Sequence, residues 1–152
     1  MASQLGLYNG ALRKLGEVKL ASLAEDRHAR YLLDDCYSDQ VDQCLSAGQW
    51  KFALRTAQVD SDTTQEPAFG FQFAFQKPTD LIRLTALSGS DLLQPPLLDV
   101  RDEGGYWWAN VDPIFIQYVS NDASYGLDLT RWPPLFANYV EFALAFEICE
   151  PL

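Results

Sequence analysis

The spacing of apolar residues predicts two helices at the start of the chain. In the first, apolar residues recur at intervals of three and four between Ser3, a typical N-cap, and Gly16, which can end the helix. The second is expected over residues 25–47, where the aspartates fall mostly opposite one apolar stripe and are interpreted as a solvated face. The stripe consists of Ala29, Leu32, Leu33, Cys36, Tyr37, Val41, Cys44 and Leu45.

The stretch LSAGQWKFAL, residues 45–54, changes from helical spacing to the alternation of a strand. Gly48 stands where a left-handed residue would end the helix, because glycine adopts that conformation without steric cost. Trp50, Phe52 and Leu54 then alternate with polar or small residues, which predicts a strand with one buried face. The stretch is therefore a predicted structural junction between helices and strands.

The middle of the chain carries further strand signals. The run FGFQFAFQ alternates four phenylalanines, beginning at Phe69, on one face, which predicts a strand pressed against an apolar surface. Other strands are expected over residues 97–101, 106–111 and 114–119.

A hairpin is expected around DEGGYWW, with Gly104 and Gly105 at its turn. Tyr106, Trp107 and Trp108 follow, and strand alternation would leave at least one of these rings exposed. An exposed ring favours a protein interface, and packing against the domain's own core is the alternative.

The last segment predicts a buried or heavily packed helix. Pro133 and Pro134 fit its first turn, where missing amide donors cost little, and the helix is expected to end near Pro151. A broad apolar stripe runs along it. The stripe consists of Phe136, Tyr139, Val140, Ala143, Leu144 and Ile148.

The order of these elements predicts an α+β fold. We expect a single domain over residues 1–152, because a chain of this length with 48% hydrophobic residues can bury a core of its own. Its predicted body is an antiparallel helical bundle formed by residues 3–48 and 133–150. An antiparallel β region, residues 50–120, is inserted between them.

Charge and hydropathy narrow the classes of function. The net charge of −10 opposes nucleic-acid binding, which depends on neutralising lysines and arginines. No apolar run approaches the roughly 20 residues of a membrane helix, and the N-terminus lacks the pattern of a secretory signal. We therefore expect no membrane association and a protein made in the cytoplasm, or in a particle assembled there.

Candidate chemistry is sparse in the sequence. Three cysteines cannot form a complete disulfide framework, and His28 is the single histidine, so neither disulfides nor a zinc site is expected. The motifs of phosphate loops, dinucleotide sites and nucleophile elbows are absent. We expect no catalytic, cofactor-binding or metal-binding residues. With 21 acidic residues, a catalytic pair of carboxylates like that of glycosidases remains an open alternative.

Five short motifs occur in an order that resembles the head-tail adaptor family of tailed phages, the tail tubular protein A-like proteins of short-tailed viruses. They lie in ALRKLGEVKLASLAED, LSAGQWKFAL, KPTDLIRL and WPPLFANYVEFALAF, so the resemblance covers nearly the whole chain. Family members usually continue with another helix and a tail that grips the portal, and here the portal contact is expected to form differently. The matching residues are Leu12, Leu15, Gly16, Glu17, Ser22, Leu23, Gly48, Trp50, Phe52, Pro78, Asp80, Arg83, Trp132, Pro133, Phe136 and Ala137.

This resemblance implies a structural virion protein and not an enzyme. Copies would form a ring, usually a dodecamer, beneath the portal protein, extend the DNA channel and provide a platform for the tail nozzle or tail tube protein. Double-stranded DNA would pass through an acidic lumen without specific binding, because like charges repel. The implied location is the head-tail junction of the virion, assembled in the host cytoplasm, with no cofactor.

The resemblance also gives roles to particular residues. Ring formation would use exposed rings at subunit interfaces, and the interface candidates are Phe69, Tyr106, Trp107 and Trp108. At the structural junction formed by Gly48, Trp50 and Phe52, Trp50 is expected to be a buried hinge anchor and not a ligand-stacking residue.

Two other functions remain open from the sequence. A small α+β enzyme built from scattered carboxylates would need a deep pocket with two close acids, one of them with a raised pKa. An interaction module unrelated to portals would fail to bind a portal ring.

Overall fold

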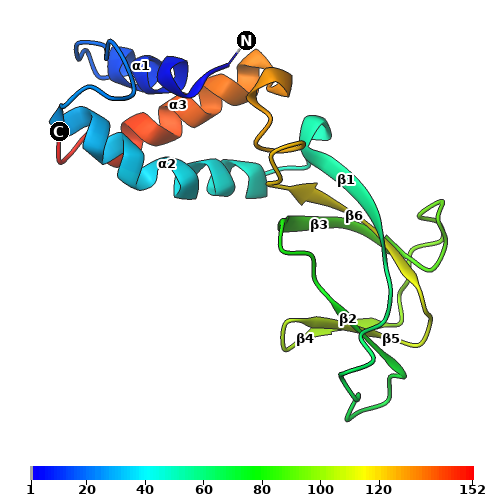
Figure 1. Ribbon diagram of the computed structural model, residues 1–152. Helices are drawn as coiled ribbons and strands as arrows, with labels where there is room; N and C mark the ends of the chain where they lie inside the picture. The colour runs from blue at the N-terminus through cyan, green and yellow to red at the C-terminus, as the bar shows by residue number, and fades with distance from the viewer. Residues whose placement is uncertain (1) are drawn as a thin grey trace.

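The computed structural model describes residues 2–152 and shows a mixed α+β protein with three helices and two small antiparallel sheets (Figure 1). The helices lie at one end of an elongated molecule, and the two sheets extend away from them (Figure 1). No helix within residues 2–152 is long and apolar enough to span a bilayer. The helices are α1 (Gln4–Lys14), α2 (His28–Ser46) and α3 (Pro134–Ile148), and short 3-10 turns occupy Lys51–Ala53 and Leu129–Arg131.

The three helices share one apolar core. The Ser3 hydroxyl caps α1 by accepting a hydrogen bond from the Gly6 amide, and Gly16, with a φ of +74°, follows the end of the helix as predicted. Helix α3 packs against both α1 and α2. Pro134 lies in the first turn of α3, where a backbone N–H has no hydrogen-bond partner within the helix. The missing N–H of proline therefore costs little there. The buried residues contributed by the three helices include Leu7, Tyr8, Leu12, Leu33, Val41, Leu45, Phe136, Val140 and Leu144.

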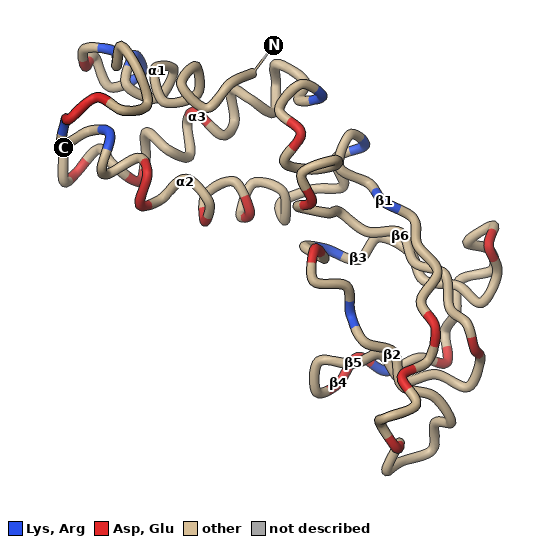
Figure 2. The backbone as a smooth tube through the Cα atoms, viewed as in Figure 1, with Lys and Arg blue, Asp and Glu red and all other residues tan. Residues whose placement is uncertain are grey.

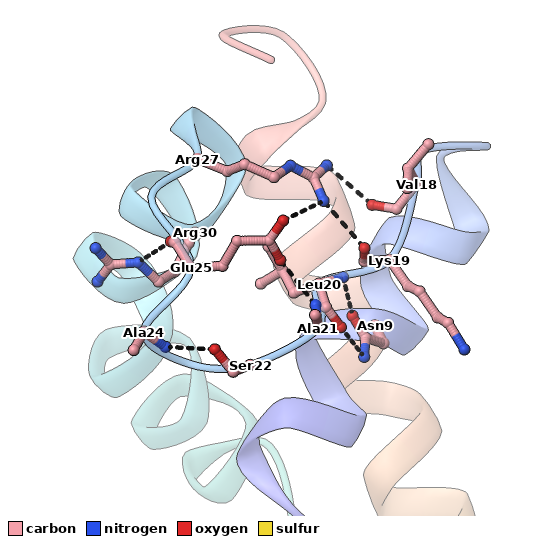
Figure 3. A network of polar contacts seen from close by, with 10 residues as sticks. All are labelled: Asn9, Val18, Lys19, Leu20, Ala21, Ser22, Ala24, Glu25, Arg27 and Arg30. Carbon is pink, nitrogen blue, oxygen red and sulfur yellow. Dashed lines mark hydrogen bonds and ion pairs between the residues drawn. The ribbon is translucent and has the colours of Figure 1, made fainter.

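The linker between α1 and α2 is held by side chains bonded to backbone groups (Figure 3). The Asn9 carboxamide accepts from the Leu20 amide at 2.7 Å and donates to the Leu20 carbonyl at 3.1 Å. Arg27 donates to the carbonyls of Val18 and Lys19 at 2.9 and 3.0 Å. These bonds satisfy polar backbone groups outside regular structure, so the linker has a defined path.

The first sheet, nearest the helices, has the strand order β1–β6–β3, and the second has the order β2–β5–β4. Gly104 and Gly105 join β4 to β5 with φ values of +65° and +83°, as a type I′ hairpin requires, which confirms the predicted hairpin. The strands are β1 (Leu54–Val59), β2 (Phe73–Gln76), β3 (Leu81–Ser88), β4 (Val100–Glu103), β5 (Tyr106–Ala109) and β6 (Ile114–Ser120).

The junction after α2 differs from its predicted conformation. Residues 51–53 form a 3-10 turn, and β1 begins at Leu54, so Trp50 and Phe52 precede the strand. Gly48 is not left-handed. A Cβ atom at Gly48 would lie 3.3 Å from the Trp50 ring, so the glycine serves close approach of that ring and not a left-handed helix end.

Trp50 joins the helices to the sheet while remaining half-buried, in contrast to the expected buried anchor. Its indole Nε1 donates to the Cys44 carbonyl at 2.9 Å, which gives this carbonyl at the end of α2 a second donor beside the Ala47 amide. The ring packs on Phe136, with centroids 4.8 Å apart. Phe52 and Trp132 also pack on Phe136, at 4.9 and 4.7 Å. We call Trp50, Phe52, Trp132 and Phe136 the junction aromatic cluster.

Two further bonds connect the end of α2 to the first sheet. Arg83 of β3 donates to the Ser46 carbonyl at 3.4 Å. Asn121, directly after β6, donates to the Asp42 carboxylate at 3.3 Å. The last turns of α2 are therefore bonded to three separate segments of the chain.

The three cysteines differ in accessibility, and this predicts their order of reaction. Cys149 is exposed, whereas Cys44 is buried and burial raises the pKa of its thiol to about 11. In monomeric protein we expect Cys149 to react first with a disulfide reagent and Cys44 to react only on unfolding. Stopped-flow thiol titration checks this. A fast phase that persists in Cys149→Ser would contradict it.

Candidate interaction surfaces

One face of α3 exposes four large apolar side chains. Leu135, Tyr139, Phe142 and Phe146 follow one another at helical intervals, so they share a face of the helix. Leu135, Phe142 and Phe146 are 75%, 55% and 78% exposed. We call these four residues the α3 outer face. A contiguous exposed apolar patch of this kind is a candidate interaction surface.

The opposite face of α3 is equally apolar. Phe136, Val140, Leu144 and Ile148 are buried in the core shared with α1 and α2. A helix that is apolar on two opposite faces has the pattern of one with other elements on both sides. In this chain α1 and α2 cover one side of it and leave the other side exposed.

The sequence itself indicates the α3 outer face, although the apolar stripe predicted for this helix left most of that face out. The expected stripe included Tyr139 and omitted Leu135, Phe142 and Phe146. These three residues remain apolar where an ordinary amphipathic helix would be polar. Apolar residues on both faces of the helix indicate a second apolar face beside the one in the core.

A shallow hollow of about 500 Å³ borders the α3 outer face. At its edge the Lys14 ammonium lies 4.6 Å from the centroid of the Phe142 ring and forms an ion pair with Glu141 at 2.7 Å. An apolar floor with a charged rim is the usual anatomy of a protein interface. The hollow is lined by Lys14, Leu15, Phe142, Ala143, Ala145, Phe146 and Cys149.

A second group of rings lies on the β2–β5–β4 sheet, at the far end of the molecule from the helices. Phe69 packs on Trp108 and on Phe71, with centroids 5.2 and 5.6 Å apart, and Tyr106 lies 6.0 Å from Trp108. The Arg101 guanidinium lies 5.5 Å from the Phe69 ring. All four rings are half-buried. We call Phe69, Phe71, Tyr106 and Trp108 the β aromatic cluster.

Three of the four predicted interface residues, Phe69, Tyr106 and Trp108, therefore lie together. The prediction for the fourth, Trp107, is wrong. Trp107 is 2% exposed and belongs to the core that also contains Phe75, because strand alternation turns it to the opposite face from Tyr106 and Trp108. The predicted strand through Phe69 is also shorter than expected, since β2 begins at Phe73. Phe69 reaches the cluster from an irregular segment.

Asp80 organises a polar network at the start of β3. Its carboxylate accepts hydrogen bonds from Ser120 at 2.5 Å, from Arg55 at 2.8 Å and from Tyr118 at 3.0 Å. Burial opposes ionisation of Asp80, but these hydrogen bonds outweigh burial and hold its pKa below the ordinary value. Burial and the bond to Asp80 raise the pKa of Tyr118 to about 12. The network joins β1, β6 and the start of β3.

Charge is unevenly distributed along the helices (Figure 2). Helix α2 carries four aspartates and one arginine, and Figure 2 shows acidic positions along its length. Basic positions gather at the C-terminal end of α1 and in the linker after it, where Arg13 and Lys19 are exposed. The two regions have opposite local charge in a chain whose net charge is −10.

The surroundings of two acidic residues shift the pKa values of their carboxyl groups. A carboxylate enzyme needs a general acid with a raised pKa, whereas hydrogen bonds lower the pKa values of both Asp62 and Asp80. Within residues 2–152 no group of three or more His, Cys, Asp or Glu side chains is placed to hold a metal ion. Asp80 instead has a structural part, because its lone pairs are taken by neighbouring strands.

Compared with protein-family models and with curated protein sequences, the chain shows no match.

Proposed function

We propose that this protein is a structural head-tail adaptor of a tailed virus, which forms a ring beneath the portal, extends the DNA channel and provides the docking platform for the tail. The observation that carries the proposal is the presence of two separate groups of large apolar side chains, one exposed and one half-buried, at opposite ends of an elongated subunit. The α3 outer face lies on the helices, and the β aromatic cluster lies on the distant sheet (Figure 1). A subunit that connects two assemblies needs two separate contact surfaces.

The residues of the family-like motifs support the proposal by the contacts that they make. Trp50 and Phe52 from the second motif region pack on Trp132 and Phe136 from the last one. Asp80, from a third region, bonds β1 and β6 near the same junction. Motif residues from three regions that lie far apart in the sequence thus meet around one junction, which is expected if they define a common architecture.

In this proposal the three helices act as an antiparallel bundle that forms the body of a dodecameric ring, and the sheets reach toward the tail nozzle or tail tube protein. Double-stranded DNA would pass through the ring without specific binding, because a chain with a net charge of −10 repels phosphates. The protein would be assembled in the host cytoplasm and reside in the virion. It would act without a cofactor and would not be an enzyme.

Binding to the portal protein of the same genome tests the proposal. Size-exclusion chromatography with light scattering is expected to show a complex that contains several copies per portal ring, and electron microscopy should place them on one face of the portal. A protein that stays monomeric both alone and with portal would count against the adaptor function. An interaction module unrelated to portals would give that result.

The β aromatic cluster gives a second measurement. Trp108→Ala is expected to weaken binding of the tail protein at least tenfold while leaving portal binding unchanged, because partly exposed tryptophans often dominate interface energies. Tyr31→Ala, which removes an exposed ring from α2, is the matched control for loss of an aromatic side chain outside this cluster. Equal effects of the two variants on tail binding would exclude the cluster as the contact.

A further inference from the structure

A hollow of about 410 Å³ is lined by residues of both sheets. One part of its wall belongs to β3, an edge strand of the first sheet, and another part belongs to β4 and β5 of the second sheet. The segment that joins β3 to β4 supplies the remaining residues. We call it the inter-sheet hollow. Its volume lies within the range of about 300–1,000 Å³ that small-molecule sites occupy.

Most of the wall of the inter-sheet hollow is apolar. Leu97 and Val100 pack against the buried core that contains Trp107, and all three residues line the hollow. Apart from the Trp107 indole, the polar side chains in the wall are those of Thr85 and Asp102. An aliphatic and aromatic wall with a few polar groups is the usual composition of a small-molecule site.

Thr85 gives the wall an unused hydrogen-bonding group. Its hydroxyl oxygen is the single buried side-chain oxygen or nitrogen without a hydrogen-bond partner within residues 2–152. Such a hydroxyl destabilises the folded chain, because it has lost its bonds to water and gained none. Buried polar groups in native proteins are nearly always bonded, so a partner from outside the chain is indicated.

The backbone beside the hollow is irregular at two positions. Thr85 is an extra residue in β3, since its two neighbours pair with adjacent residues of β6. Bulges of this kind are common next to functional sites. Leu93, also in the wall, has a φ of +59°, a left-handed conformation that is unfavourable for leucine. Backbone strain concentrates at binding sites, so both irregularities agree with a site here.

The irregularity of β3 also decides which kind of occupant fits. A peptide that extends a sheet needs a regular row of backbone donors and acceptors along the edge strand. In β3 the register with β6 shifts on both sides of the Arg83–Leu84 pair, which interrupts that row. A compact molecule is therefore favoured over an added strand.

The charges at the rim favour a neutral molecule. The Asp102 carboxylate forms an ion pair with the Lys77 ammonium at 2.7 Å. The same ammonium lies 5.5 Å from the centroid of the Trp107 ring. Because the two charges offset each other, neither is left without a partner for a charged ligand.

We propose that the inter-sheet hollow binds a small, neutral, largely apolar molecule that forms a hydrogen bond with the Thr85 hydroxyl. A hydroxyl both donates and accepts, so the polar group of the ligand is a hydroxyl or a carbonyl. The bound molecule would contact residues of both sheets. This site is separate from the proposed adaptor contacts, since no residue of the α3 outer face or of the β aromatic cluster lines it.

Titration of the purified chain with 2-naphthol and with naphthalene tests the site. The two probes share an apolar fused ring, and 2-naphthol adds one hydroxyl. Methyl-detected NMR should show shifts at Thr85 and Leu97 with both probes, and 2-naphthol should bind about tenfold more tightly. Shifts that leave these two residues unaffected, or equal affinities for the two probes, would overturn the inference.

Thr85→Val isolates the hydroxyl, because it nearly preserves the shape of the side chain. The free variant should be at least as heat-stable as wild type, since it loses a polar group without a partner. Its affinity for 2-naphthol should fall about tenfold, while its affinity for naphthalene stays the same. Thr56→Val, at an exposed threonine of β1, is the matched control and should alter neither affinity. A lower melting temperature for Thr85→Val, or an unchanged affinity for 2-naphthol, would contradict the proposal.

Two adjacent leucines test the apolar wall. Leu97 lines the hollow, whereas Leu98 is 90% exposed and lies outside it. Leu97→Ala is expected to weaken binding of both probes about tenfold, and Leu98→Ala should leave it unchanged. Equal effects of the two variants would place the probes elsewhere on the chain and overturn the inference.

Portal binding separates this inference from the proposed function. A chain that binds 2-naphthol through Thr85 but does not bind portal would support the site and contradict the adaptor function. A chain that binds portal but not 2-naphthol would support the adaptor function and overturn the site.

Discussion

Phe136→Ala is expected to lower the free energy of unfolding by about 3–5 kcal/mol, the usual cost of removing a buried phenylalanine ring. Phe136 is fully buried, and three rings of the junction aromatic cluster pack on it with centroids less than 5 Å away. Its loss would leave a cavity between α3 and the segment that leads into β1. Trp50 and Phe52 would lose their main aromatic contact.

Urea denaturation followed by far-ultraviolet circular dichroism measures this effect, at a fixed low concentration because self-association would add to apparent stability. Phe142→Ala makes the same chemical change on the exposed side of the same helix and should alter stability by less than about 1 kcal/mol. Similar losses in the two variants would show that the two faces of α3 do not differ as described.

Asp80→Asn is expected to cost about 2–4 kcal/mol near neutral pH, because it removes a charged acceptor and leaves buried hydroxyl donors without adequate partners. The variant retains the shape of the side chain. It cannot accept bonds from Ser120, Tyr118 and Arg55 with the same strength. Asp102→Asn is the control, since the Asp102 carboxylate is 59% exposed in its ion pair with Lys77, and it should cost less than about 1 kcal/mol.

The Asp80 effect should depend on pH in a defined direction. The folded state holds the pKa of Asp80 below its ordinary value of 3.8, so the stabilisation by the carboxylate is complete above 3.8. It is lost as the pH falls through the lower, folded-state pKa. The stability difference between wild type and Asp80→Asn should therefore shrink well below pH 3.8. A difference that stays constant there would contradict the assigned charge state.

The α+β class and the order of helices and strands could be predicted from local patterns. Residues that act through their own backbone conformation were predicted well, as Gly16 and the pair Gly104 and Gly105 show by their positive φ values. These positions are decided by steric rules within a few residues.

Features that depend on distant contacts could not be predicted in the same way. Gly48 has the sequence context of a left-handed helix end, but it does not adopt that conformation, and its missing side chain instead allows the close approach of the Trp50 ring. Trp107 and Trp108 are adjacent in the sequence, and which of them is buried depends on the face that the second sheet turns to the core. Asp80 was part of a motif, yet its partners come from two other strands.

The bonds at the end of α2 have a mechanical consequence for the whole subunit. Cys44, Ser46 and Asp42 are each tied to a different segment beside the first sheet, so bending between helices and sheet would break several contacts at once. We therefore expect the helices and the first sheet to move as one rigid unit. We expect a tilt of the first sheet to be passed to α2 and, through the core that α2 shares with α3, to the α3 outer face, so that the orientation of this face follows that of the sheet.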